Sequence, residues 1–177
     1  DTIGNLFSAN KISEYLKSQR VDMLPKTILE YLTYLNSAYF VRRIRPMDIQ
    51  GKKQFQIGEK YYFEDLGIRN AIRPFRATDI GQVLENVVCH HLLVCGYALY
   101  IGRDGDKEVD FVAERNGEKL YVQVAYSVID PKTHEREFGN LLAIQDNYPK
   151  IVVTMDEVEG VSYQGIEQVP VRKFLLR

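Results

Sequence analysis

Apolar residues that recur at helical spacing indicate two helices at the start of the chain. The first follows Ser8, which is a suitable N-cap, and the second begins at Pro25, a residue favoured in the first turn, and runs to about Ser37. The apolar stripes are Ile12, Tyr15 and Leu16 in the first helix and Ile28, Tyr31, Leu32 and Leu35 in the second.

After these helices the pattern changes to the period of two that is typical of strands. Residues 39–45 and 54–57 are predicted strands, and Gly51 supplies a turn in the polar connection between them. A further strand at 60–63 and a short helix at 64–71 follow. Two helices and then a two-stranded ribbon are the order of a winged helix-turn-helix.

The second half of the chain begins with a helical apolar pattern from Ile80 to Cys95, which Gly96 ends. Three strands follow, separated by the hairpin turns Asp104-Gly105 and Asn116-Gly117, and then a helix and a very apolar strand. These elements are predicted at 97–101, 108–113, 119–128, 131–144 and 150–155. Their order predicts the core of an α/β sandwich, not a doubly wound nucleotide fold.

Pro74 and the polar residues up to Asp79 mark the predicted boundary between two domains, at 1–78 and 79–177. The net charge of -1 conceals an asymmetry between them. The first domain has 13 Lys and Arg against 8 Asp and Glu, and the second has 10 against 16. This split fits an arm for nucleic acid or an acidic partner beside a cation-binding body, although ordinary solvated faces also produce it.

The composition indicates a cytoplasmic protein. Cys89 and Cys95 lie within one apolar helical run, six residues apart, and are expected to be reduced thiols. No apolar run approaches the length of a membrane span, and no basic-then-apolar leader is present. Because the chain starts at Asp1 without a methionine, we expect it to be a fragment of a longer protein.

Basic residues of the first domain are the ones expected to contact nucleic-acid phosphates. They are Lys26, Arg42, Arg43, Arg45, Lys52 and Lys53. The second helix has few side chains that pair with base edges, and Glu30 would repel phosphate. Binding is therefore expected to have weak sequence preference and a steep salt dependence. The alternative is a winged helix that only holds domains together.

Three polar side chains in the second domain are placed where they can converge. Glu85 emerges at the edge of the buried face of its helix. Asp110 lies between Val109 and Phe111 on a strand, where alternation sends it to the opposite face from both, and Gln123 sits among apolar neighbours on the next strand. A buried polar group needs a partner. A bridging divalent cation is one solution, and a hydrogen-bond network is the other.

Several motifs carry a resemblance to a known family. They are Lys60-Tyr61-Tyr62-Phe63-Glu64-Asp65-Leu66-Gly67, Leu84-Glu85-Asn86, Glu108-Val109-Asp110-Phe111, Tyr121-Val122-Gln123-Val124-Ala125-Tyr126, Arg136-Glu137-Phe138 and Asp146-Asn147-Tyr148-Pro149-Lys150. Together they resemble the C-terminal half of a widespread prokaryotic family of AAA-type ATPases with a C-terminal domain of unknown function. The resemblance implies a winged helix and then a PD-(D/E)XK nuclease-like domain, a restriction-endonuclease-like α/β sandwich with a mixed central sheet.

The nuclease pattern, carried over by position, makes Glu85 and Asp110 the metal-binding and catalytic carboxylates. Gln123 falls where the motif has Asp or Glu, and Ala125 falls where it has Lys. The missing carboxylate weakens the affinity for Mg²⁺ or Mn²⁺, and the missing lysine removes an electrostatic contribution of about 10²–10³ in rate. Lys119 is roughly 20 Å from Ala125 along the strand, too far to substitute.

We therefore expect a nucleic-acid-associated module of an AAA-type ATPase, with a degenerate site at Glu85, Asp110 and Gln123, that binds DNA or a protein partner without efficient cleavage. The expected partner is the N-terminal ATPase core of the same protein. No G-x-x-x-x-G-K-[ST] run occurs, so this fragment is not expected to bind ATP. The alternatives are an active Mg²⁺-dependent DNA endonuclease or resolvase and a scaffold for protein interactions. The oligomeric state is left open.

Overall fold

The computed structural model describes residues 7–51, 58–158 and 160–177 of the chain. Within these residues six α-helices, one 3-10 turn and eight strands are present. In chain order they are α1 (Ala9–Ser18), α2 (Pro25–Ser37), β1 (Val41–Asp48), β2 (Lys60–Phe63), α3 (Leu66–Ile72), η1 (Ala77–Asp79), α4 (Ile80–Val94), β3 (Ala98–Asp104), β4 (Lys107–Arg115), β5 (Glu118–Ala125), α5 (Pro131–Leu142), β6 (Lys150–Thr154), β7 (Ser162–Tyr163), β8 (Ile166–Pro170) and α6 (Val171–Phe174).

The strands form one mixed sheet in the order β2-β1-β3-β4-β5-β6-β8-β7. β3, β4 and β5 make the antiparallel meander that the sequence predicts, and β6 adds to it in parallel. β8 continues in parallel beside β6, and β7 closes this edge as a short antiparallel strand. The expectation of an α/β fold with a mixed central sheet is confirmed at this level.

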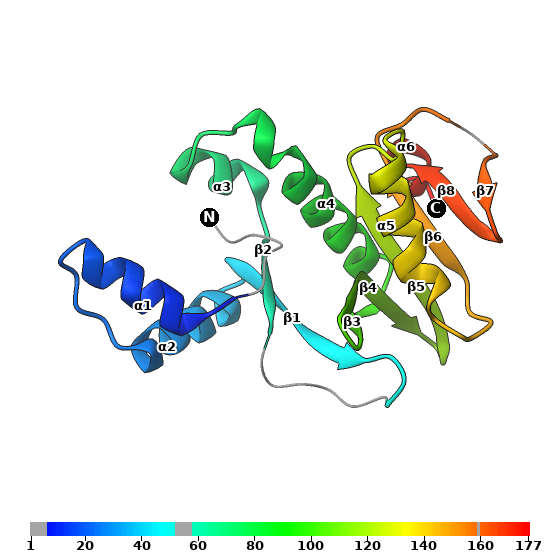
Figure 1. Cartoon of the computed structure of the whole chain (residues 1–177). Coiled ribbons are helices and arrows are strands. Elements are labelled where there is room, and N and C mark those ends of the chain that lie inside the picture. The colour runs from blue at the N-terminus through cyan, green and yellow to red at the C-terminus, as the bar shows by residue number, and fades with distance from the viewer. Residues whose placement is uncertain (1–6, 52–57, 159) are drawn as a thin grey trace.

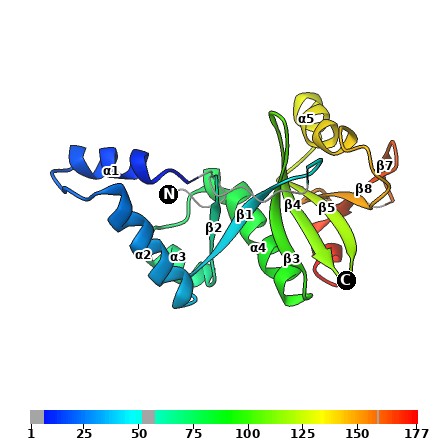
Figure 2. The same cartoon turned by 90° about the horizontal axis from the view of Figure 1, so that it is seen from below.

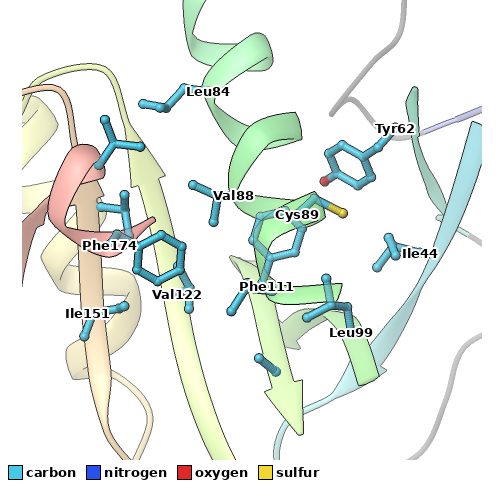
Figure 3. Close-up of a cluster of buried hydrophobic side chains, with 14 of the residues drawn as sticks. Ile44, Tyr62, Leu84, Val88, Cys89, Leu99, Phe111, Val122, Ile151 and Phe174 are labelled. Atoms are coloured by element: carbon cyan, nitrogen blue, oxygen red, sulfur yellow. The ribbon is translucent and has the colours of Figure 1, made fainter. Parts of the chain in front are cut away.

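Helices cover both faces of this sheet, so the molecule has three layers (Figures 1 and 2). One core cluster joins α4 and α6 to the sheet through Val88, Leu92 and Phe174. A second cluster joins α5 to the opposite face through Phe138 and Leu141. In Figure 3, α4 runs between side chains of β1 and β2 and those of β5, β6 and α6.

A bulge in β4 breaks the alternation on which the prediction for Asp110 rested. Tyr100 pairs with Val112 and Gly102 pairs with Val109, so two steps on β3 oppose three on β4. The bulge sends Val109 into the α5 cluster and Phe111 into the α4 cluster. The expectation that both neighbours of Asp110 share one face is therefore wrong. A β-carbon added at Gly102 would lie 2.9 Å from Val112 Cγ2, so the position opposite the bulge has no room for a side chain.

The sheet runs across the predicted domain boundary at residue 78. β1 pairs with β2 in antiparallel fashion and with β3 in parallel, so the ribbon of the first half is an extension of the sheet in the second half. The predicted strand at 54–57 lies outside the described residues, as do Lys52 and Lys53. The division into a winged helix and a second domain stays a prediction.

The hairpin of α1 and α2 projects from the β2 end of the sheet, away from α5 and α6 (Figures 1 and 2). Ser8 caps α1 by accepting a hydrogen bond from the backbone N–H of Lys11, as the sequence predicts. At the far end of α2, Asn36 Oδ1 accepts a hydrogen bond from the Arg43 N–H at 3.0 Å. α1 has no buried residue and α2 has only Ile28, so most of the hairpin surface is open to solvent.

Candidate acidic site with an internal lysine

The structure brings the three predicted site residues together. Glu85 on α4 and Asp110 on β4 both contact the ammonium of Lys60, at 3.0 Å from Glu85 Oε1 and 3.5 Å from Asp110 Oδ1. Gln123 on β5 is joined to them, because its side-chain oxygen accepts a hydrogen bond from the Asp110 N–H at 3.3 Å. Their catalytic and metal-binding roles stay a prediction, but their proximity is a feature of the fold.

Lys60 is the central residue of this site and was not among the predicted site residues. It lies on β2, in the first half of the chain, and only 3% of its surface is exposed. Its ammonium also contacts Glu108 Oε1 at 2.7 Å, which makes three acidic partners. A lysine in an apolar strand, two residues before Tyr62 and therefore on the same face, is the sequence signal that could have indicated it.

The charge of Lys60 is fixed by its surroundings. Burial lowers the pKa of Lys60, but Asp110, Glu85 and Glu108 outweigh this effect, so the pKa lies above its usual value. The side chain is therefore an ammonium at neutral pH. Tyr62, whose hydroxyl donates to Glu85 Oε1 at 2.6 Å, has its pKa raised by burial and by Glu85 and stays protonated.

Gln123 completes its hydrogen bonds within the protein. Its amide nitrogen donates to Glu137 Oε2 at 2.7 Å, and the other oxygen of Glu137 is paired with Arg136. Glu137 comes from α5 and is 3% exposed. Both polar atoms of the Gln123 side chain therefore have protein partners.

Neither Ala125, at the position where the nuclease motif has lysine, nor Lys119, on the same strand, contributes to this site. Ala125 is buried in the cluster against α5. Lys119 pairs with Glu114 at 2.9 Å on the meander. The cation beside Asp110 therefore comes from β2 and not from β5.

The acidic groups do not fit a metal ion as they stand. Among the described residues, no group of three His, Cys, Asp or Glu side chains is arranged to hold a metal. Carboxylate oxygens that bind Mg²⁺ lie about 2.0–2.1 Å from the ion. Here the oxygens of Glu85, Glu108 and Asp110 surround the Lys60 nitrogen at 2.7–3.5 Å, which is the spacing of hydrogen bonds to an ammonium.

Most of the basic residues predicted to contact phosphates are described, and three have acidic partners. Arg42 contacts Glu64 at 2.7 Å, and Arg43 and Arg45 each lie 3.8 Å from Glu59. Lys26 is exposed near the start of α2. The glutamates near the arginines of β1 therefore reduce the positive electrostatic potential of this ribbon.

The pKa of Asp110 predicts a pH dependence of stability. Burial raises this pKa to about 8, helped by Glu85 and opposed by Lys60 and by the Val124 N–H. Between the usual carboxyl pKa near 4 and about 8, the folded state keeps a proton that the unfolded state loses, so folding weakens as the pH rises. We expect the melting temperature of the wild type to fall more between pH 5 and pH 8.5 than that of Asp110→Asn. Asp106→Asn, in an exposed turn, is the control and should follow the wild type; parallel curves for all three proteins contradict the account.

Residues 80–174, just over half of the chain, match the family described as "Domain of unknown function (DUF4143)", and the chain belongs to this family. An uncharacterized protein of Haemophilus influenzae strain Rd is 37% identical over all 177 residues of this chain. The chain spans 44% of the length of that relative, less than half. No solved structure matches.

Across the described residues, no helix has the length and apolar character that crossing a membrane requires.

Proposed function

We propose that this chain is the docking arm of a longer protein, which binds another part of that protein through the α1–α2 hairpin and does not cleave nucleic acid. The sequence leaves binding of DNA, binding of a protein and cleavage of DNA open as functions, and this proposal chooses binding of a protein. A single observation carries it, which is the exposed apolar surface of the hairpin. Its other supports are the charge of that surface, the acidic site and the length of the relative.

The hairpin exposes an unusual density of large apolar side chains. Those with at least a third of their surface exposed between positions 15 and 39 are Tyr15, Val21, Leu24, Leu29, Tyr31, Tyr34, Leu35 and Tyr39. Leu24, the N-cap residue of α2, and Tyr31, Tyr34 and Leu35 within the helix are 68%, 54%, 66% and 37% exposed; we call these four residues the α2 stripe. Exposed apolar side chains gathered on one hairpin are typical of an interaction site, and tyrosine is enriched at such sites.

The charge of this surface favours a protein partner over nucleic acid. No charged residue occurs from Tyr31 to Phe40. Affinity for nucleic acid depends on lysine and arginine that neutralise phosphates, and three arginines of the adjoining β1 are already near glutamates. The α2 stripe therefore suits an apolar protein surface.

The relative's length supports a partner within the same polypeptide. More than half of the Haemophilus influenzae protein lies outside the region that this chain matches. The resemblance implies that the outlying part holds an AAA-type ATPase core. A docking surface on the arm and a large partner in the same polypeptide make an intramolecular contact, which needs no high intrinsic affinity because the linkage raises the effective concentration.

The acidic site supports the absence of cleavage. Lys60 and Asp110 are 3% and 8% exposed, so the centre of the site is closed to a phosphodiester. The described acidic groups are not arranged for a metal ion, and the positions expected to hold an acid and a lysine hold Gln123 and Ala125.

The experiment is a calorimetric titration of residues 1–177 with the remainder of the longer protein, produced as a separate chain. We expect saturable binding with little dependence on salt between 50 and 500 mM, because the surface is apolar. A parallel titration with branched and single-stranded DNA is expected to give no saturable heat. Salt-sensitive binding to DNA without binding to the protein overturns the proposal, and self-association of the arm assigns the α2 stripe to a second copy instead.

A further inference from the structure

The ammonium of Lys60 lies at the point where the side chains of Glu85, Glu108 and Asp110 converge. We infer that the ammonium of Lys60 takes the place of a divalent cation here, so that this acidic cluster is held together without metal. This inference concerns the interior of the sheet and does not depend on the docking function proposed above. It has three supports, namely the convergence of the acids, their second hydrogen-bond donors and the origin of the lysine.

The acids converge on one nitrogen atom from two separate elements. Glu85 comes from α4, and Glu108 and Asp110 come from β4, where the bulge next to Asp110 alters the direction of the side chains. Their oxygens lie 3.0, 2.7 and 3.5 Å from Lys60 Nζ. Carboxylates brought this close repel one another when they are charged, and the Lys60 ammonium between them offsets that repulsion.

Each acid has a second donor from the protein in addition to Lys60. Tyr62 donates to Glu85, Arg103 contacts Glu108 at 2.9 Å, and the Val124 N–H donates to Asp110 at 2.9 Å. A metal site needs carboxylate lone pairs that are turned toward one empty position. In this cluster one oxygen of Glu85 and both oxygens of Glu108 and of Asp110 contact N–H or O–H groups, which is the arrangement of a hydrogen-bonded ion network.

The lysine reaches the cluster from the far edge of the sheet. β2 is the edge strand, and Lys60 is separated from Glu85 and Asp110 by 25 and 50 residues. Because 3% of it is exposed, its burial is tolerable only with these partners. Lys60 thereby links β2 to α4 and β4 by charge. A free metal ion could make the same link only at a concentration high enough to occupy the site.

The test is a Mn²⁺ titration of residues 1–177 followed by calorimetry, in five proteins: the wild type, Lys60→Met, Lys60→Arg, Asp110→Asn and a double variant. Lys60→Met removes the charge and keeps an unbranched stem, and Lys60→Arg keeps the charge. We expect no stoichiometric Mn²⁺ binding by the wild type or by Lys60→Arg. Lys60→Met is expected to bind one Mn²⁺ ion, with an affinity at least tenfold higher than any binding by the wild type. The double variant Lys60→Met with Asp110→Asn removes one of the new ligands and is expected to lose this gain.

Each other outcome contradicts the inference. Stoichiometric binding of Mn²⁺ by the wild type that disappears in Asp110→Asn shows that the ammonium does not occupy the cation position. A folded Lys60→Met protein with no gain in Mn²⁺ affinity shows the same. If Lys60→Met is unfolded without metal, the inference requires millimolar Mn²⁺ to restore its circular dichroism spectrum, and failure to do so overturns it.

Discussion

Replacing Lys60 with methionine is expected to lower the free energy of unfolding by about 3–5 kcal/mol, because it leaves buried acids without their cation. Lys60 contacts Glu85, Glu108 and Asp110 and is 3% exposed, so water cannot replace the lost charge. Urea unfolding measures the change, which appears as a lower midpoint at constant slope. At pH 4 the loss is expected to be smaller, since protonated acids no longer repel one another.

The matched control is the same substitution at Lys119. Lys119 also forms an ion pair, with Glu114 at 2.9 Å, but that pair lies near the surface, with side chains 14% and 33% exposed. Pairs of this kind contribute about 0–1 kcal/mol. Equal losses of stability in Lys60→Met and Lys119→Met contradict a central role for the buried ammonium.

Charge placed on the α2 stripe is expected to weaken the docking of the arm by about 1,000-fold. Anchoring aromatic and apolar residues of an interface contribute about 2 kcal/mol or more each, and tenfold in affinity corresponds to about 1.4 kcal/mol. The variant is the pair Tyr31→Asp and Leu35→Asp, whose side chains follow each other by four residues on one helix face. The measurement is the calorimetric titration against the remainder of the longer protein.

Two controls separate loss of docking from loss of folding. Val94→Asp and Ile129→Asp place the same charge on residues that are 85% and 80% exposed but lie outside the hairpin, and they are expected to bind as the wild type does. The stripe variant is expected to unfold within about 0.5 kcal/mol of the wild type, because its sites are exposed. Equal weakening by the controls and the stripe variant rules out the α2 stripe as the docking surface.

The order of helices and strands was predictable from the sequence because the signals are local. The helix from Pro25 to Ser37 and the strand from Lys60 to Phe63 have the bounds that their patterns predict. Gly96, with φ +83°, ends α4 as expected for a residue in the left-handed region. β8 and α6 were not predicted, because residues 166–174 form two very short elements whose order comes from packing beside β6.

The acidic site was predictable only in part, because its centre comes from another region of the chain. Glu85, Asp110 and Gln123 were predicted on a helix and two successive strands, and that order indicated their proximity. Lys60 lies 50 residues before Asp110, and only the pairing of β1 with both β2 and β3 brings it there. The bulge at Asp110 was also hidden, since an extra residue in a strand leaves no mark in an apolar pattern.

The docking function depends on whether the α2 stripe is covered in the longer protein. Hydrogen exchange of the backbone amides from Leu24 to Tyr39, compared between residues 1–177 alone and the full polypeptide, measures this directly. We predict slower exchange of these amides in the full polypeptide and unchanged exchange in β4 and β5. Equal exchange of α2 in the two proteins contradicts the proposal that this arm docks through its hairpin.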